Sequence, residues 1–527
     1  MKKEILFFYF CIALNALPIL LFRFFPSMDG PAHLYNANVL SQLCRDQSEV
    51  LHHYYTINPA LVPNWTSHVL LAGFKVFLPA FLAEKVLLLL YVVGLPLTFR
   101  KFISCIAPSQ SALTYIIFPF IYNYLFCLGF YNLSLSIILL FAGLTIAIRQ
   151  IQAPSLRGWV GQAILFLLTY FTHPFSFALL VLGSFAIWAA QCLFSPVPPS
   201  TSLFQRFLSA RPNLVRLGFA CFIPVLLLLH FYATQHFYNS GQRLSTGEIM
   251  RYLKDLRPLI CYHYDLELRL TEHLYHLFAG LTAIAFYERI NGVISGQYSK
   301  MERFKRFFQP NDVWLSLALL LLVLLFVVPN SASAGMMSDR FALFFFLFWA
   351  TWLAVQPLRP WLLRTAIIII LVLNFGLTYR YIRVAKDQNK IVAQCVAASQ
   401  YIPAGSTVLP LNYANNWLVP HFSNYLGIEK PMLILENYEA DTGWFPLLWR
   451  TARPSPIFGD DIAPACLPGF TGPLGTAIPV DYVFLLGKLN QTDSCQVRIK
   501  EILDHDYESV YHSDNAAVFL YRHKHAL

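Results

Sequence analysis

The sequence predicts a mainly α-helical protein that spans a membrane many times and ends in a soluble α/β domain. Hydrophobic residues make up 57% of the chain and charged residues only 13%, whereas soluble globular chains carry about 25% charged residues. Apolar runs of about twenty residues, long enough to cross a bilayer core, recur up to residue 379. Beyond residue 380 the chain contains Asp, Asn, Pro, Gly and short β-rich runs. We therefore expect a polytopic transmembrane helical bundle over 1–379 and a soluble domain over 380–527.

About eleven apolar segments are expected to cross the bilayer. They are 5–25, 83–99, 111–128, 130–148, 158–172, 174–194, 213–233, 271–288, 311–329, 340–357 and 361–379. The first resembles a signal sequence, but Arg23-Phe24-Phe25 is no small-residue cleavage site, so we expect an uncleaved span. His173-Pro174 is expected to be a turn between two spans, because proline disrupts a helix interior. One long kinked helix is the alternative there, and it would change the number of crossings.

Charge placement sets the predicted topology. If the apolar stretch 66–80 does not cross the bilayer, the short basic loops all lie on the same side as the N-terminus. Examples are the loop that contains Arg100 and Lys101 and the loop 289–306. Basic loops favour the cytoplasm, so we expect 66–80 to be a helix at the outer surface. The prediction is a multi-pass protein of the bacterial inner membrane, with a cytoplasmic N-terminus and a periplasmic or extracytoplasmic C-terminal domain. The net charge of +10 then reflects topology and not nucleic-acid binding.

The tail 380–527 is expected to be one α/β domain. The runs 408–411, 482–486 and 517–521 are typical of strands, and 385–401 is typical of a helix. Cys466 and Cys495 share this domain and would form a disulfide only in an oxidising compartment.

The first outer loop, 26–82, begins with an unusual segment, Met28-Asp29-Gly30-Pro31-Ala32-His33. Pro31 suits the first position of a helix, and the apolar spacing that follows predicts an amphipathic juxtamembrane helix lying on the membrane. Asp29 would stand at its start, where the helix dipole favours a carboxylate. The alternative is that Asp29 merely caps a surface helix.

These segments together resemble the GT-C superfamily of polytopic glycosyltransferases. The resemblance lies in Asp29-Gly30-Pro31-Ala32-His33, Pro63-Asn64-Trp65, Gly129-Phe130-Tyr131-Asn132, His173-Pro174 and Ser338-Asp339-Arg340-Phe341, all on one predicted face. It implies transfer of a sugar, hexosyl or pentosyl, from a polyprenyl-phosphate-linked donor in the bilayer. The acceptor would be a lipid, a glycan of the cell envelope or a protein.

The chemistry of sugar transfer assigns roles to a few of these residues. An acceptor hydroxyl must lose a proton, and Asp29 is the expected general base. The leaving lipid phosphate needs a cation, and Arg340 is the expected ligand because guanidinium binds phosphate in two-point fashion. Arg340 could instead be an interfacial anchor or pair with Asp339, and Arg269 is among the alternative phosphate ligands of the loop 234–270.

Histidines and asparagines of the same face complete the predicted substrate site. The histidines would orient the acceptor or the phosphate, or serve as structural hydrogen-bonding groups, and the asparagines would bind sugar hydroxyls or cap helices. These residues are His33, His68, His173, Asn36, Asn64 and Asn132.

No cofactor is assigned from the sequence. Neither a CxxC nor an HExxH pattern occurs, so we predict no metal ligands. Many GT-C enzymes carry two adjacent acidic residues in the first loop, whereas Asp29 has no acidic neighbour, so a need for Mg²⁺ or Mn²⁺ stays open.

Two other functions remain open. A transporter or flippase of lipid-linked sugars would carry ionisable groups near the bilayer midplane, whereas the predicted spans are almost free of charge. A non-catalytic membrane scaffold would leave the placement of Asp29 and Arg340 without a reason.

Overall fold

The computed structural model describes residues 2–194, 202–235, 241–295, 298, 300–332, 335–455, 457, 459 and 478–522. The chain divides into two compact units. The helical unit comprises Met1–Leu17, Leu89–Phe126 and Leu133–Ile382, and the mixed unit comprises Pro18–Leu88, Cys127–Asn132 and Arg383–Leu527. Each unit is described by itself below.

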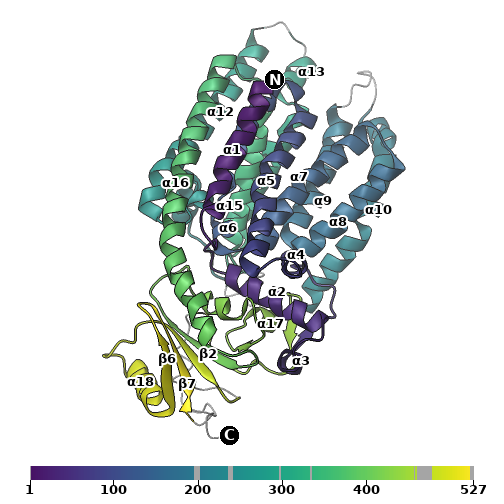
Figure 1. Ribbon diagram of the computed structural model, residues 1–527. Helices are drawn as coiled ribbons and strands as arrows, with labels where there is room; N and C mark the ends of the chain where they lie inside the picture. The colour runs from purple at the N-terminus through teal and green to yellow at the C-terminus, as the bar shows by residue number, and fades with distance from the viewer. Residues whose placement is uncertain are drawn as a thin grey trace. The chain divides into compact units, whose positions relative to one another are not determined.

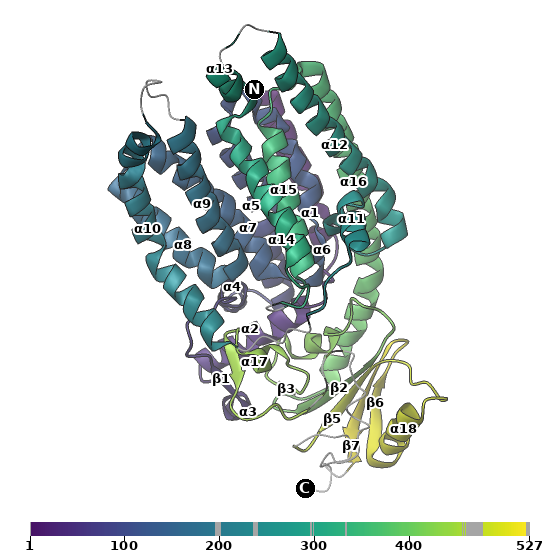
Figure 2. The same cartoon turned by 180° about the vertical axis from the view of Figure 1, so that it is seen from behind.

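Long helices build the helical unit (Figures 1 and 2). It contains the whole or the larger part of α1 (Lys2–Leu20), α5 (Ala80–Ile106), α7 (Tyr131–Gln152), α8 (Leu156–Thr172), α9 (Pro174–Phe194), α10 (Leu203–Thr234), α12 (Tyr264–Ile294), α14 (Val313–Val327), α15 (Met337–Ala354) and α16 (Pro360–Ala398). The shorter α11 (Thr246–Lys254) and α13 (Lys300–Phe307), with the 3-10 turns η2 (Arg257–Leu259) and η3 (Pro310–Asp312), join them. The break between α8 and α9 falls at His173, as expected for a turn before proline.

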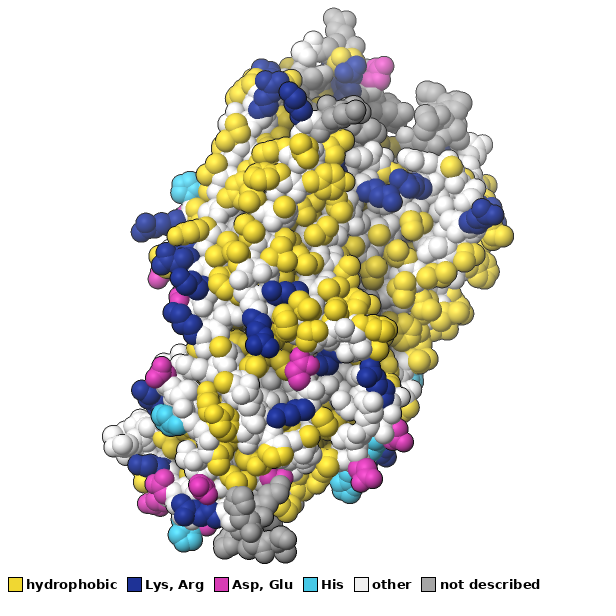
Figure 3. Space-filling model, in the orientation of Figure 1, with side chains coloured by type: hydrophobic (Ala, Val, Ile, Leu, Met, Phe, Trp, Pro, Cys, Tyr) yellow, Lys and Arg dark blue, Asp and Glu magenta, His cyan; other side chains and the backbone are white. Residues whose placement is uncertain are grey.

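The helical unit has the surface of a membrane protein. Among the described residues, eight helices are long and apolar enough to cross a bilayer, which confirms a polytopic helical bundle; the count of eleven crossings stays a prediction. Figure 3 shows hydrophobic side chains spread broadly over the long helices. On α10, Phe219 is 78% exposed and Leu229 is 61% exposed. Apolar patches of this extent are rare on soluble monomers, so lipid is the fitting neighbour.

One expected span differs from a regular helix. The stretch 111–128 contains the 3-10 helix η1 (Pro108–Phe120), followed after a break by the short α6 (Tyr124–Leu128). Pro119 lacks an N–H and disrupts an α-helical ladder. Asn123 then accepts a hydrogen bond from the backbone N–H of Phe126 at 3.0 Å and starts the next helix.

A five-stranded sheet in the order β3-β2-β5-β7-β6 forms the end of the mixed unit. Its strands are β2 (Thr407–Tyr413), β3 (Leu433–Ile434), β5 (Tyr482–Gly487), β6 (Tyr507–His512) and β7 (Ala516–Tyr521). Strand β2 runs parallel to β3 and β5, whereas β7 runs antiparallel to β5 and β6. Helix α18 (Ser494–Asp506) connects β5 to β6 and packs beside β6 (Figure 1). The expected α/β character and the three expected strands are thus confirmed.

Two details of the tail differ from expectation or lie beyond the described residues. The helix expected over 385–401 is not separate but forms the end of α16, followed by the 3-10 turn η4 (Ser399–Tyr401). Cys495 takes part in a disulfide, while Cys466 lies outside the described residues, so their pairing stays a prediction.

The first outer loop folds together with the tail. It contains α2 (Gly30–Cys44), α3 (Glu49–Tyr54), β1 (Tyr55–Ile57) and α4 (Thr66–Lys75), and β1 pairs antiparallel with β4 (Leu447–Trp449) of the tail. The rings of Tyr55 and Trp449 stack with centroids 4.4 Å apart. Helix α2 packs against α4 and against the 3-10 turn η5 (Phe422–Gly427).

Helix α2 corrects one expectation. We expected an amphipathic helix lying on the membrane, but most residues of α2 are buried within the mixed unit, including His33 and Asn36 on its polar face. Residues of the tail cover the polar face of α2 and form hydrogen bonds with its asparagines. The Asn36 amide donates to Asn437 at 3.0 Å, and the Asn38 amide donates to the carbonyl of Gly427 at 2.8 Å.

Candidate functional site

Asp29 stands immediately before α2, and the fold fixes its backbone. Its N–H donates to the carbonyl of Leu128 at 2.9 Å, and its carbonyl accepts from the N–H of His33 at 3.0 Å. Gly129 allows this approach, because a Cβ there would lie 2.9 Å from the Asp29 Cβ and its φ is +98°. Within the described part of the chain, the Asp29 carboxylate makes no capping hydrogen bond to α2. The carboxylate is therefore available for another role than capping.

His421 lies next to the Asp29 carboxylate, and a second carboxylate, Glu436, lies on the other side of His421. The His421 Nε2 is 3.6 Å from the Asp29 Oδ1, and the His421 Nδ1 is 2.5 Å from the Glu436 Oε1. Glu436 is held by the amide of Asn424 at 2.7 Å and the hydroxyl of Ser423 at 3.2 Å. The side chain of Asp29 is 9% exposed and that of Glu436 is fully buried. These three groups form an acid–histidine–acid row, which we call the Asp29 row.

Burial and charge shift the pKa values in this row in opposite directions. Burial raises the pKa of Asp29, and the nearby charges of His421 and His33 oppose that rise without cancelling it. Burial would lower the pKa of His421, but Glu436 and then Asp29 outweigh it and raise that pKa to about 9. At neutral pH the row therefore holds a charged histidine beside a carboxyl group of raised basicity.

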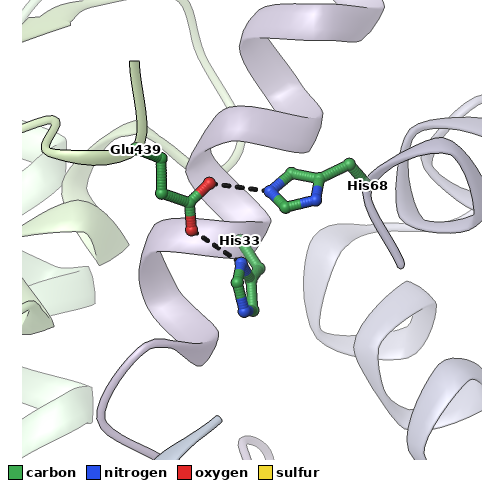
Figure 4. Close-up of side chains that lie close together, drawn as sticks. All are labelled: His33, His68 and Glu439. Atoms are coloured by element: carbon green, nitrogen blue, oxygen red, sulfur yellow. Dashed lines mark hydrogen bonds and ion pairs between the residues drawn. The ribbon is translucent and has the colours of Figure 1, made fainter. Parts of the chain in front are cut away.

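A second cluster lies one helical turn further along α2 and consists of His33, His68 and Glu439. Figure 4 shows both imidazoles directed at the Glu439 carboxylate, from α2, α4 and α17 (Glu439–Thr442). The His33 Nδ1 lies 2.6 Å from Glu439 Oε1, and the His68 Nε2 lies 2.7 Å from Glu439 Oε2. We call these three residues the His-His-Glu cluster.

The cluster favours a charged Glu439. Burial alone would raise the pKa of Glu439, but His33 and His68 outweigh it and lower the pKa to about 2. Burial likewise opposes protonation of His33, yet the charge of Glu439 raises the pKa of His33 above its ordinary value. Tyr438 joins the two clusters, because it precedes Glu439 and its hydroxyl bonds the Asp29 carboxyl group.

The predicted asparagines are engaged within the mixed unit. The Asn132 side chain accepts from the Ser67 N–H at 2.7 Å and donates to the Asn64 carbonyl at 2.9 Å. Asn64 itself adopts a left-handed conformation with φ of 67° at the approach to α4. Asn36 donates to Glu439 at 2.9 Å. All three therefore help to position α2 and α4 around the clusters.

The remaining predicted site residues belong to the helical unit. His173 follows α8 and is buried. Asp339 and Arg340 lie in the first turn of α15 and are both buried, with Arg340 6% exposed. Arg269 is an exposed residue of α12. Their predicted roles toward a lipid phosphate stay predictions.

Sequence reasoning missed the partners supplied by the tail, which are His421, Glu436 and Glu439. One signal was available: Glu436 follows directly on the apolar run Met432–Leu435, and Glu439 stands three residues further on. Acidic residues rarely become buried without partners. The sequence contained no indication of which histidines would pair with them.

Comparison with solved structures shows what this fold is similar to. No family model matches this chain, and no curated protein matches its sequence. The fold is similar to that of ArnT from Cupriavidus metallidurans, whose crystal structure was solved bound to undecaprenyl phosphate. The TM-score is 0.51, the sequence identity is 9%, and the match covers 98% of each chain. The likeness shows that the two proteins share one fold over nearly the whole chain, as the resemblance to polytopic glycosyltransferases led us to expect.

Proposed function

We propose that this chain is a membrane glycosyltransferase that uses a polyprenyl-phosphate-linked sugar, with Asp29 as general base. The observation that carries the proposal is the Asp29 row. Its Asp29 carboxyl group has a raised pKa, makes no cap bond to α2 among the described residues, and lies near His421, which in turn pairs with Glu436. It stands at the start of the first juxtamembrane helix of a GT-C fold. The similar fold of ArnT was solved with a polyprenyl phosphate bound, which supports this class of donor.

The reaction forms one bond and breaks one bond at the anomeric carbon. The acceptor oxygen attacks that carbon, its proton passes to the Asp29 carboxylate, and the bond to the lipid phosphate oxygen breaks. A base of raised pKa removes a hydroxyl proton more readily than an ordinary aspartate. Protonated His421 orients the carboxylate between turnovers.

The leaving lipid phosphate carries negative charge and requires a cation. We assign this role to Arg340, with Arg269 as the alternative phosphate ligand. Asp339 would pair with Arg340, and His173 would orient the acceptor or the phosphate. The sugar is a hexose or pentose, and the acceptor is a lipid, glycan or protein on the extracytoplasmic side.

The test uses the full chain purified in detergent and a panel of polyprenyl-phosphate sugars, with free lipid phosphate as the measured product. The wild type is expected to release lipid phosphate from at least one donor in the presence of an acceptor. Asp29→Asn keeps the shape of the side chain but removes the base, and general bases contribute roughly 100- to 10,000-fold to rates. A wild-type chain that releases no product from any donor would overturn the proposal.

A further inference from the structure

Three ligand atoms meet in the His-His-Glu cluster. One ring nitrogen of His33, one of His68 and a carboxylate oxygen of Glu439 lie within 4.8 Å of one another. The side chains are 5%, 1% and 0% exposed, respectively. Imidazole nitrogens and carboxylate oxygens are preferred ligands of Zn²⁺.

In both histidines, the ring nitrogen that faces away from Glu439 has a polar neighbour. The far nitrogen of His33, Nε2, lies 2.9 Å from the carbonyl oxygen of Gly129. The far nitrogen of His68, Nδ1, lies 3.4 Å from the hydroxyl of Ser67. Metal-binding histidines commonly donate their second N–H to a carbonyl or similar group, which fixes the ring and leaves the first nitrogen free to ligate.

The hydrogen bond of His33 determines its tautomer. A carbonyl oxygen only accepts, so the His33 Nε2 carries a hydrogen. In a neutral ring the His33 Nδ1 then has a lone pair, which points at another set of lone pairs on Glu439 Oε1, 2.6 Å away. Apart from this contact with each other, neither atom has a hydrogen-bond partner among the described residues. Either a proton or a cation must lie between them.

A metal ion fits with small movements. Tetrahedral Zn²⁺ with bonds of about 2.0–2.2 Å separates its ligand atoms by about 3.3 Å, whereas the two nitrogen–oxygen contacts measure 2.6 Å and 2.7 Å. Each contact must open by less than an ångström. Mg²⁺ fits less well, because it prefers an octahedral shell of oxygen ligands.

We propose that His33, His68 and Glu439 bind one Zn²⁺ ion that ties α2, α4 and α17 together, with the fourth position filled by water. The ligands come from residues far apart in the chain, so the ion cross-links the first outer loop to the tail within the mixed unit. Because His33 lies one turn after Asp29 on α2, the ion also fixes the start of that helix.

The test measures metal content and stability, and neither readout depends on sugar transfer. The full chain is purified in detergent with its affinity tag removed, stripped with a chelator, incubated with ZnCl₂ and desalted. We expect about one zinc per chain by mass spectrometry and a higher thermal unfolding midpoint, because an ion bound only to the folded state stabilises it. Co²⁺ in place of Zn²⁺ should give the visible absorbance of a four-coordinate site.

Two variants and one control locate the ion. His68→Ala and Glu439→Gln should each lose the zinc and the midpoint shift, while His53→Ala, an exposed histidine of α3, should retain both. If a ligand variant fails to fold, the Co²⁺ spectrum of the wild type shows whether the chain holds a four-coordinate metal ion. The proposal is overturned if the reconstituted wild type holds no zinc, if its zinc survives in folded His68→Ala, or if Co²⁺ gives only an octahedral spectrum.

Discussion

The helical unit and the mixed unit differ in how their buried polar groups are paired. In the helical unit many such bonds are local: the Thr145 hydroxyl donates to the carbonyl of Phe141, four residues earlier, at 2.7 Å. In the mixed unit they join distant segments, as between Asn36 and Asn437, which are 401 residues apart. Local bonds complete helices that apolar runs already specify. Distant bonds depend on the finished fold, and it is there that the candidate chemistry gathers.

Among these distant partners, we expect substitution of Glu439 to cause the largest loss of stability. Glu439→Ala leaves two histidines and the Asn36 amide without their carboxylate, and breaking a buried ion pair from one side costs roughly 3–5 kcal/mol. We expect a large fall in the thermal unfolding midpoint of the purified chain. Glu508→Ala on β6, where the residue is exposed, is the control and should change little. Equal midpoints for both variants would show that the buried Glu439, with its distant partners, contributes no more to stability than an exposed glutamate.

Asn36 tests the same interface with a neutral group. Asn36→Ala deletes the hydrogen bonds to Asn437 and Glu439, and an unsatisfied buried polar partner costs roughly 1–3 kcal/mol. The expected result is a smaller loss of midpoint than for Glu439→Ala. A loss equal to that of Glu439→Ala would mean that the carboxylate charge adds nothing.

The pH dependence of stability should report on His421. The groups that face it are Asp29, Glu436, Tyr438 and Glu439. Its pKa is raised from an ordinary value near 6.5 to about 9, so folding favours the protonated form. That contribution is fully present below about pH 6.5 and is lost as pH rises through about 9.

We expect the unfolding midpoint of the wild type to fall between pH 7 and pH 10 by more than that of His421→Asn, which has no imidazole to titrate. Parallel pH curves for the two chains would contradict the charged state of His421.

The smallest effect is expected on the outer face of the helical unit. Leu229 on α10 is 61% exposed, whereas Leu180 on α9 is fully buried. Leu229→Ala should change stability by about 0.5 kcal/mol or less, while Leu180→Ala should cost roughly 2–5 kcal/mol. Unfolding of both variants in detergent checks this pair, and similar losses would show that Leu229 packs against protein and not lipid.

The same comparison explains what the sequence could predict. The long helices follow from apolar length alone, and strands β2, β5 and β7 follow from β-branched and aromatic runs. Strand β3 has two residues, too few to form a recognisable pattern. Strand β6 was not predicted from the sequence because the exposed Glu508 and Ser509 interrupt its apolar run.

The site was less accessible to prediction. The segment around Asp29 was recognised from its position after the first span, and His33, Asn36 and His68 join it in the mixed unit. The amphipathic assignment of α2 failed because helical periodicity shows a polar face but not its cover by Asn437 and Glu439. The partners His421 and Glu436 lie about 400 residues away in the sequence, and nothing local links them to Asp29.

Loss of turnover with retained binding tests the role of Asp29 most directly. The pair to compare is Asp29→Asn and Asp46→Asn, because Asp46 also lies in the first outer loop but is 92% exposed. With a donor that the wild type consumes, both variants should bind the polyprenyl-phosphate sugar as the wild type does. Asp29→Asn should then release lipid phosphate at least about 100-fold more slowly, and Asp46→Asn at the normal rate. Transfer by Asp29→Asn within a few-fold of the wild-type rate would contradict the account.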